Sequence, residues 1–166
     1  KPFFLTSFRK KVETTLCQPS DFEPTMKVQD SVLAGMHILV AEDNEINAEI
    51  LGELLEMAGA VCDICENGRL VADTFEGSQP GCYQLILMDV QMPVMNGYEA
   101  TKAIRRSAHP QASRIPIVAM TANAFAEDIR DALEAGMDGH VAKPVDMAVL
   151  EQTVKESLEK RLVYQG

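Results

Sequence analysis

Polar side chains stand directly after four of the short apolar runs of this sequence. The runs cover residues 37–41, 84–88, 117–120 and 139–142, and the polar residues that follow them are Glu42, Asp43, Asp89, Thr121 and Lys143. They comprise three carboxylates, one hydroxyl and one ammonium group, all far apart in the chain. If the fold brings them together, they form a site with a definite chemistry.

Three carboxylates cannot crowd together in ionised form without a counter-charge. A hard divalent cation with oxygen ligands, Mg²⁺ or Mn²⁺, would supply that charge and would also neutralise an incoming phosphoryl group. Lys143 adds a point charge for a carboxylate or phosphoryl oxygen, Thr121 adds a hydroxyl donor, and the small Ala122 leaves room. In the strand order that we infer, Asp89 lies between the acid pair and Lys143. We therefore expect Asp89 to be the nucleophile.

The elements that must position these groups follow from the apolar pattern. Continuous rather than alternating apolar runs are typical of strands that are buried on both faces of a parallel sheet. Segments with helical periodicity lie between and after the runs, at 45–58, 68–76, 98–107, 125–135 and 146–161. Five successive βα units predict a doubly wound α/β fold with helices on both faces of the sheet. Ligands of such sheets bind beyond the carboxyl ends of the strands, where the polar residues fall.

Each of these residues alone has a plainer interpretation. Asp43 could only cap a helix, Asp89 could be a turn residue, and Lys143 could be an ordinary surface lysine. Their common placement at one edge of one sheet favours a functional site.

Four segments resemble the receiver domains of response regulators. They read Ala-Glu-Asp-Asn at 41–44, Leu-Met-Asp-Val-Gln-Met-Pro-Val-Met-Asn-Gly at 87–97, Ile-Val-Ala-Met-Thr-Ala at 117–122 and Ala-Lys-Pro at 142–144. The agreement of four motifs in order and spacing makes the resemblance specific, and it covers about residues 36–160. It implies a flavodoxin-like parallel sheet of five strands in the order 2-1-3-4-5.

For the site, the resemblance implies that Asp89 is phosphorylated and that Thr121 and Lys143 bind the phosphoryl oxygens. It implies that Mg²⁺ is held by Glu42, Asp43 and Asp89, together with the backbone carbonyl of Gln91. The family often carries an aromatic residue three positions before the lysine, which swings inward when the threonine moves. Here that residue is His140. The switch of Thr121 and His140 is then weaker or pH-sensitive, or else His140 is a half-buried histidine with no signalling role.

The segments 43–47 and 120–124 look like those of receivers fused to sensor histidine kinases. We therefore expect as partner the phosphohistidine helix of a kinase or a histidine phosphotransfer domain, and leave a homodimer open. The net charge of 15 − 25 = −10 argues against direct nucleic-acid binding. No apolar run approaches the roughly 20 residues that span a bilayer, so we expect no membrane contact and a cytoplasmic location. The parent protein can still be anchored in a membrane.

The predicted helix at 44–58 has an unusually wide apolar surface. At 100° per residue, Ile46, Ile50, Leu54 and Met57 form one arc of roughly 80°, which we expect to face the sheet. A second arc of similar width lies beyond it, and we expect it to contact the partner helix, unless the N-terminal segment covers it. This second arc consists of Ala48, Leu51, Leu55 and Ala58.

An internal repeat suggests the domain organisation. Lys1-Pro2 and Lys143-Pro144 are both followed by apolar residues at offsets of six, ten and fourteen from the proline. We expect residues 1–17 to be the last helix of an upstream receiver-like domain and residues 18–35 to be a linker. The receiver domain would then cover 36–161, with a tail at 162–166. The alternative is a plain amphipathic helix at the N-terminus.

Two other functions compete with the phosphoacceptor. An aspartate-nucleophile phosphatase on a related fold needs a second acid two residues after the nucleophile, where this chain has Gln91. A degenerate receiver that only binds partners would not need all five site residues. We therefore expect no independent turnover enzyme, but a receiver within a parent histidine kinase. The pair Cys62 and Cys65 lies in a predicted strand, so its sulfurs should point to opposite faces and form no metal site.

Overall fold

The computed structural model describes residues 31–122, 126–143 and 145–165 of the 166-residue chain. The parallel strands are β1 (His37–Ala41), β2 (Val61–Cys65), β3 (Leu85–Asp89), β4 (Ile117–Thr121) and β5 (Gly139–Ala142). The helices are α2 (Glu45–Met57), α3 (Gly68–Glu76), α4 (Gly97–Arg106), α5 (Ala126–Ala135) and α6 (Met147–Gln165). Strands and helices alternate along the described chain, as the apolar pattern predicts.

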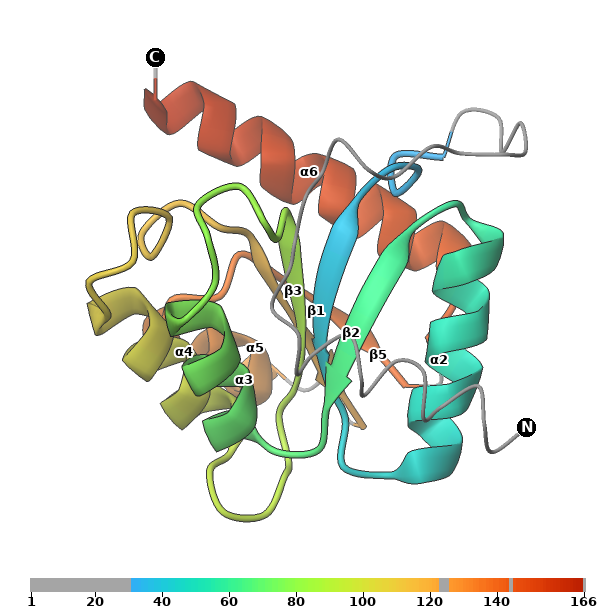
Figure 1. Ribbon diagram of the computed structural model, residues 1–166, viewed down its shortest axis with the longest axis horizontal. Helices are drawn as coiled ribbons and strands as arrows, with labels where there is room; N and C mark the ends of the chain where they lie inside the picture. Colours follow the sequence, from blue (N-terminus) through green and yellow to red (C-terminus); the bar gives the residue numbers. More distant parts are fainter. Residues whose placement is uncertain (1–30, 123–125, 144, 166) are drawn as a thin grey trace.

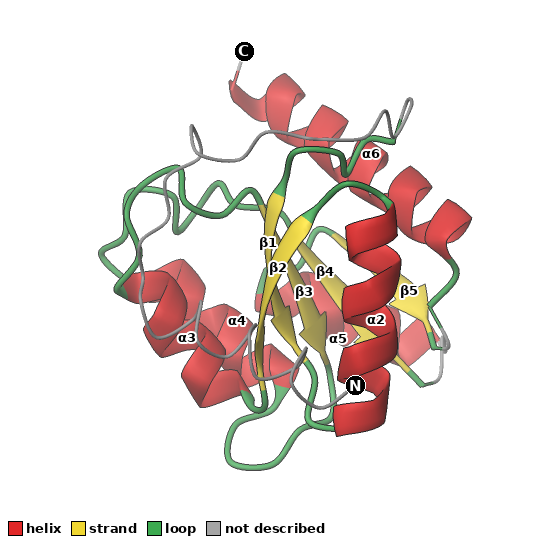
Figure 2. Ribbon diagram, turned by 45° about the vertical axis from the view of Figure 1, so that its right-hand side comes forward, coloured by secondary structure: helices red, strands yellow, loops and turns green. Residues whose placement is uncertain are grey.

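The strands form one parallel sheet in the order β2-β1-β3-β4-β5, which confirms the predicted doubly wound topology. Helices α2 and α6 cover one face, and α3, α4 and α5 cover the other (Figures 1 and 2). All strands run the same way, so their carboxyl ends meet at one edge of the sheet. This edge is the lower end of the molecule in Figure 1.

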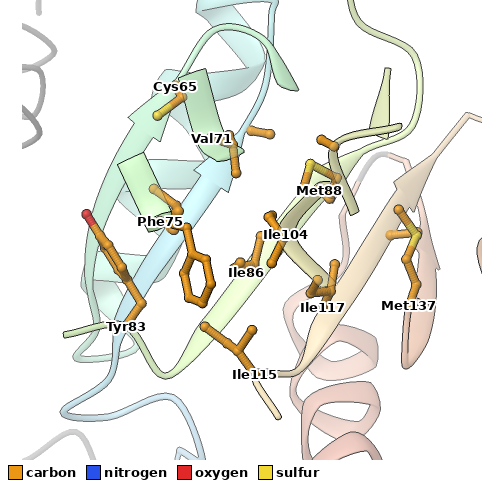
Figure 3. Packing of buried hydrophobic residues seen from close by; sticks show 14 of the residues in the cluster. Cys65, Val71, Phe75, Tyr83, Ile86, Met88, Ile104, Ile115, Ile117 and Met137 are labelled. Carbon is orange, nitrogen blue, oxygen red and sulfur yellow. The ribbon is translucent and has the colours of Figure 1, made fainter. Parts of the chain in front are cut away.

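Each face of the sheet has its own apolar core. Phe75, Ile104 and Met88 belong to the cluster beneath α3, α4 and α5, part of which Figure 3 shows. Leu55 and Leu150 belong to the cluster beneath α2 and α6. Because both faces are covered, every residue of β3 and β4 is buried, which explains their continuous apolar runs.

Asparagine and glycine residues determine where several helices begin and end. Asn44, Asn67 and Asn96 cap the N-termini of α2, α3 and α4 through their side-chain oxygens. Gly59 and Gly136, the expected C-terminal glycines, have φ of 91° and 112°, which side chains with a Cβ rarely adopt. The helices therefore begin and end close to where the sequence predicts them.

Several boundaries differ from the prediction by one or more residues. β3 is shifted by one residue so that it ends at Asp89, β4 extends by one residue to include Thr121, and α6 continues to Gln165 instead of ending at residue 161. Leu33, in the predicted linker 18–35, is fully buried in the core beneath α2 and α6. The packed region thus begins ahead of residue 36, because Leu33, which precedes β1, is part of that core. The predicted helix 1–17 and residues 18–30 of the linker lie outside the described residues.

The two cysteines of the Cys-x-x-Cys pair lie as expected. Cys62 belongs to the core beneath α2 and α6, and Cys65 belongs to the core on the other face. Both are buried and neither is in a disulfide, and burial raises the pKa of the Cys65 thiol to about 11. The pair therefore forms no common metal or redox site.

Candidate functional site

The carboxyl edge of the sheet gathers the polar residues that follow the strands. Asp89 and Thr121 are the last residues of β3 and β4, and Glu42 and Lys143 come directly after β1 and β5. A cavity of about 190 Å³ opens at this edge. Its lining consists of Glu42, Asp43, Asn44, Asn47, Asp89, Val90, Gln91, Ala122 and Lys143.

The acidic residues converge as a cluster. Glu42, Asp43 and Asp89 each offer a carboxylate oxygen within 4.8 Å of the others. The residues Glu42 and Asp89 are each only 3% exposed, whereas Asp43 is exposed. Carboxylate oxygens at such separations can hold a hard divalent cation, which would offset their mutual repulsion.

Lys143 contributes a positive charge to this acidic cluster. Its Nζ lies 2.8 Å from Asp89 Oδ2 and 3.0 Å from Glu42 Oε2. Burial by itself would lower the pKa of Lys143, but the hydrogen bonds to Asp89 and Glu42 outweigh it and raise the pKa. The lysine is therefore an ammonium donor that links the two buried carboxylates.

Glu42 has a perturbed acidity. Burial raises its pKa to about 7, against the opposing hydrogen bonds from the Asn44 N–H and from Lys143. The Asn44 N–H donates to Glu42 Oε1 at 3.1 Å, and Lys143 donates to Oε2. Both oxygens of Glu42 thus have a protein partner.

Backbone groups also position Asp89 and its neighbours at the site. The Gln91 N–H donates to Asp89 Oδ1 at 3.2 Å, and the Lys143 N–H donates to the Thr121 carbonyl at 2.8 Å. Gly97 packs directly against the end of β3, where an added Cβ would lie 2.3 Å from the Asp89 carbonyl oxygen. A residue larger than glycine at this position would displace Asp89.

The remaining predicted residues fall into two groups. Ala122 and Gln91 line the cavity, and Thr121 is buried at the end of β4 beside it. His140 lies on β5, half-buried and outside the cavity lining. Asn44, Asn47 and Val90 also line the cavity but were not predicted as site residues, although Asn47 follows the capping Asn44 at helical spacing.

The predicted orientation of α2 is wrong. Ala48, Leu51, Leu55 and Ala58, which were expected to meet a partner, are at most 8% exposed and pack on the sheet. Ile46, Ile50 and Met57, which were expected to face the sheet, are 70%, 52% and 75% exposed. The arc with two alanines and Gly52 is buried because small side chains let the helix lie close to the sheet.

The sequence profile of the Response regulator receiver domain family matches residues 38–155, a span that contains the whole acidic cluster and every strand residue except His37, the first residue of β1. The chain belongs to this family. The receiver of the sensor histidine kinase PA1611 from Pseudomonas aeruginosa is 35% identical, with a TM-score of 0.66. That match covers 76% of this chain and 99% of the other, and the other structure has a magnesium ion coordinated in its active-site cleft.

Two further comparisons relate this receiver to signalling proteins of eukaryotes. The receiver of Ssk1, seen with the Saccharomyces cerevisiae histidine phosphotransfer protein Ypd1, is 32% identical, with a TM-score of 0.62 over 72% of this chain and 86% of the other. Probable histidine kinase 2 of Oryza sativa subsp. indica is 36% identical over 129 residues, which are 71% of this chain.

Hybrid signal transduction histidine kinase I of Dictyostelium discoideum is 34% identical over 137 residues, which are 81% of this chain. The receiver spans only 12% and 8% of the length of these two kinases. Within the described residues, no helix combines the length and the apolar character needed to cross a bilayer.

Proposed function

We propose that this receiver accepts a phosphoryl group from a phosphohistidine onto the carboxylate of Asp89, within a hybrid sensor histidine kinase. The observation that carries the proposal is the position of Asp89. Its carboxylate is buried at the floor of the acidic cavity, bonded to Lys143 and within 4.8 Å of the oxygens of Glu42 and Asp43. A buried carboxylate that is oriented by a lysine and lies at an open cavity is suited to nucleophilic attack.

The transfer exchanges one bond to phosphorus for another. An Asp89 oxygen forms a P–O bond while the P–N bond of the phosphohistidine breaks, and the imidazole nitrogen keeps the electron pair and takes a proton from solvent. Lys143 would move its hydrogen bond from Asp89 to a phosphoryl oxygen, and Thr121 would donate its hydroxyl to another. Ala122, at the cavity wall, leaves room for the group. This chemistry requires little beyond positioning and charge stabilisation.

A divalent cation fits the acidic cluster, since three carboxylates converge there and Lys143 pairs with two of them, Glu42 and Asp89. Asp43 and Asp89 would hold Mg²⁺ or Mn²⁺ directly, together with the carbonyl of Gln91. Glu42 would act through water, because both of its oxygens already accept hydrogen bonds. When bound, the cation neutralises the carboxylates and the phosphoryl oxygens together.

The response to phosphorylation would run through Thr121 and His140. The register pairs Ala119 with His140 and Thr121 with Ala142, so both side chains project from the same face of the sheet. Movement of Thr121 toward the phosphoryl group would open space along β4 that the His140 ring can enter.

The acyl phosphate should persist as a signal. Gln91 occupies the position where an aspartate-nucleophile phosphatase carries its second acid, and a carboxamide cannot protonate a leaving group or activate water. We therefore propose a phosphoacceptor and no independent turnover enzyme. The parent chain would supply the kinase, in keeping with the histidine kinases that match this receiver.

The partner would dock on the exposed arc of α2. Ile46, Ile50 and Met57 form an apolar strip that begins at the mouth of the acidic cavity. A second hollow of about 120 Å³ lies beside this strip. Ile50, Leu54 and Val145 line it, and it also reaches Glu42 and Lys143 of the acidic cavity. An apolar helix that carries phosphohistidine fits this surface, as does a histidine phosphotransfer protein.

Labelling by a small phosphodonor tests the proposal. With Mg²⁺ and phosphoramidate, the chain should take up acid-labile phosphate, and Asp89→Asn should abolish it. A stable label identifies a receiver, whereas a label that turns over rapidly identifies a phosphatase. No label on the folded wild-type chain, or an undiminished label on the variant, would refute the assignment of Asp89.

A further inference from the structure

The loop between β3 and α4 contains a residue that is unfavourable in two ways. Val94 has φ of 69° and is the one non-glycine residue with positive φ in the described part of the chain. Its side chain is 81% exposed, more than any other large apolar side chain that the structure describes. A β-branched residue is strained in this left-handed region, which glycine and asparagine enter more easily.

The strain arises because the rest of the loop is fixed. The Met95 N–H donates to the Pro93 carbonyl at 2.7 Å and closes a three-residue turn around Val94. The Gly68 N–H donates to the Met95 carbonyl at 3.2 Å, and the Asn96 side chain caps α4. The loop therefore presents Val94 to solvent in a defined position, and the described chain buries little of the side chain.

This loop borders the acidic cavity. Val90 and Gln91 line one side of the cavity, and Asn44 and Asn47 at the start of α2 line the other. Figures 1 and 2 both show the loop and the start of α2 at the same end of the sheet. A phosphohistidine must therefore approach Asp89 between the loop and α2. Exposed Ile46 and Ile50 lie on the α2 side of this approach, and Val94 lies in the opposite loop.

We propose that Val94 is a second apolar anchor for the phosphohistidine helix of the donor protein, across the cavity from Ile46 and Ile50. This inference rests on the proposed function and names a residue that selects its partner. The donor helix would need apolar side chains on both flanks of its phosphohistidine, one set for α2 and one for Val94. A helix of about 10–12 Å in diameter can contact both rims of the cavity at once. A rigidly held side chain loses less conformational entropy on docking, and this gain would offset the cost of the strained turn.

The test substitution is Val94→Asn, which relieves the backbone strain and removes the apolar side chain together. The donor should be a histidine phosphotransfer protein chosen because it phosphorylates the wild-type chain. We expect the variant to melt at a higher temperature but to accept phosphate from this donor roughly tenfold more slowly in kcat/KM, since a buried valine anchor is lost. The rate of labelling by phosphoramidate should not change. Val94→Ile, which keeps an apolar anchor, should keep the wild-type rate with both donors.

The control removes an exposed apolar side chain elsewhere. Leu133 is 54% exposed in the last turns of α5, far from the carboxyl edge, and Leu133→Asn should leave both rates unchanged. A Val94→Asn variant as fast as wild type with the protein donor would overturn the proposal. Equal slowing with both donors would overturn it too, because Val94 would then act on site geometry. Absence of phosphoramidate labelling on wild type would instead refute the phosphoacceptor function itself.

Discussion

Gly97 gives the sharpest test of how the scaffold positions the phosphoacceptor. The substitution Gly97→Ala adds a Cβ that would lie 2.3 Å from the Asp89 carbonyl oxygen and 2.9 Å from Val90 Cα. Real Cβ atoms essentially never approach other heavy atoms closer than 3.0 Å, so the backbone must give way by at least 3.0 − 2.3 = 0.7 Å. The obstructing atoms belong to the backbone, which cannot rotate aside as a side chain can.

The cost follows from what that shift disrupts. The Gly97 N–H donates to the Val90 carbonyl at 2.9 Å, and Asp89 is the last residue of β3 in the centre of the sheet. Overpacking of this kind costs about 1–3 kcal/mol, and against backbone we expect the upper end, about 3 kcal/mol. For a domain of this size that lowers the melting temperature by about 6–12 °C. The fraction that still folds should label more slowly, by about tenfold or more, because the nucleophile has moved.

Two measurements check this prediction. Thermal unfolding followed by circular dichroism gives the stability of the fold. The phosphoramidate labelling rate below the melting temperature reports whether Asp89 is still correctly placed for attack. The matched control is Gly77→Ala, because at Gly77 the nearest atom to an added Cβ is the Asp73 carbonyl oxygen at 3.5 Å. The control should stay within about 0.5 kcal/mol of wild type. A Gly97→Ala protein that melts and labels like the Gly77→Ala control would show that the close packing behind Asp89 does not position it.

Further predictions concern the buried polar cluster of β2 and the cation site. Tyr83→Phe should destabilise the fold by about 1.5–3 kcal/mol in urea titrations, because it removes the donor to the 1%-exposed Asp63 at 2.8 Å. An unchanged urea midpoint would contradict the idea that this hydrogen bond stabilises the fold. Asp43→Ala should weaken Mg²⁺ binding more than Glu42→Ala does, measured by calorimetric titration, since the Glu42 oxygens already have protein partners. The reverse order would refute the ligand assignment.

Much of the fold and the candidate site could be predicted because they depend on local patterns. Continuous apolar runs mark strands that are covered on both faces, and a parallel sheet places the residues after its strands at one edge. Asp89 and Lys143 therefore meet although 54 residues separate them. Asparagine caps and C-terminal glycines fix the helix ends by local hydrogen bonds and backbone conformation, so the helix ends could also be predicted from the sequence.

The face of α2 that packs on the sheet was predicted incorrectly, although a usable signal was present. Four glutamates of this helix (Glu45, Glu49, Glu53 and Glu56) cluster on one side, about 135° from the centre of the arc that contains Leu51 and about 100° from the centre of the arc that contains Ile46. The arc farther from the charges is the buried one, because ionised carboxylates must stay in water. Counting apolar residues alone could not separate two adjacent arcs of equal width.

Only the tertiary structure revealed the cluster of Asp63, His37 and Tyr83. Asp63 Oδ2 accepts the Tyr83 hydroxyl and lies 2.8 Å from His37 Nε2, while the rings of His37 and Tyr83 lie 4.8 Å apart. Burial, followed by the charge of Asp63, raises the pKa of Tyr83, which therefore remains a donor. Nothing local in the sequence pairs these residues, because β1, β2 and the segment before β3 meet only when the sheet forms. Residue types and their order along the chain thus determine the strands and the chemistry of the site. Which side chains become partners depends on the packing of distant segments, since burial and hydrogen-bond geometry exist only in the folded chain.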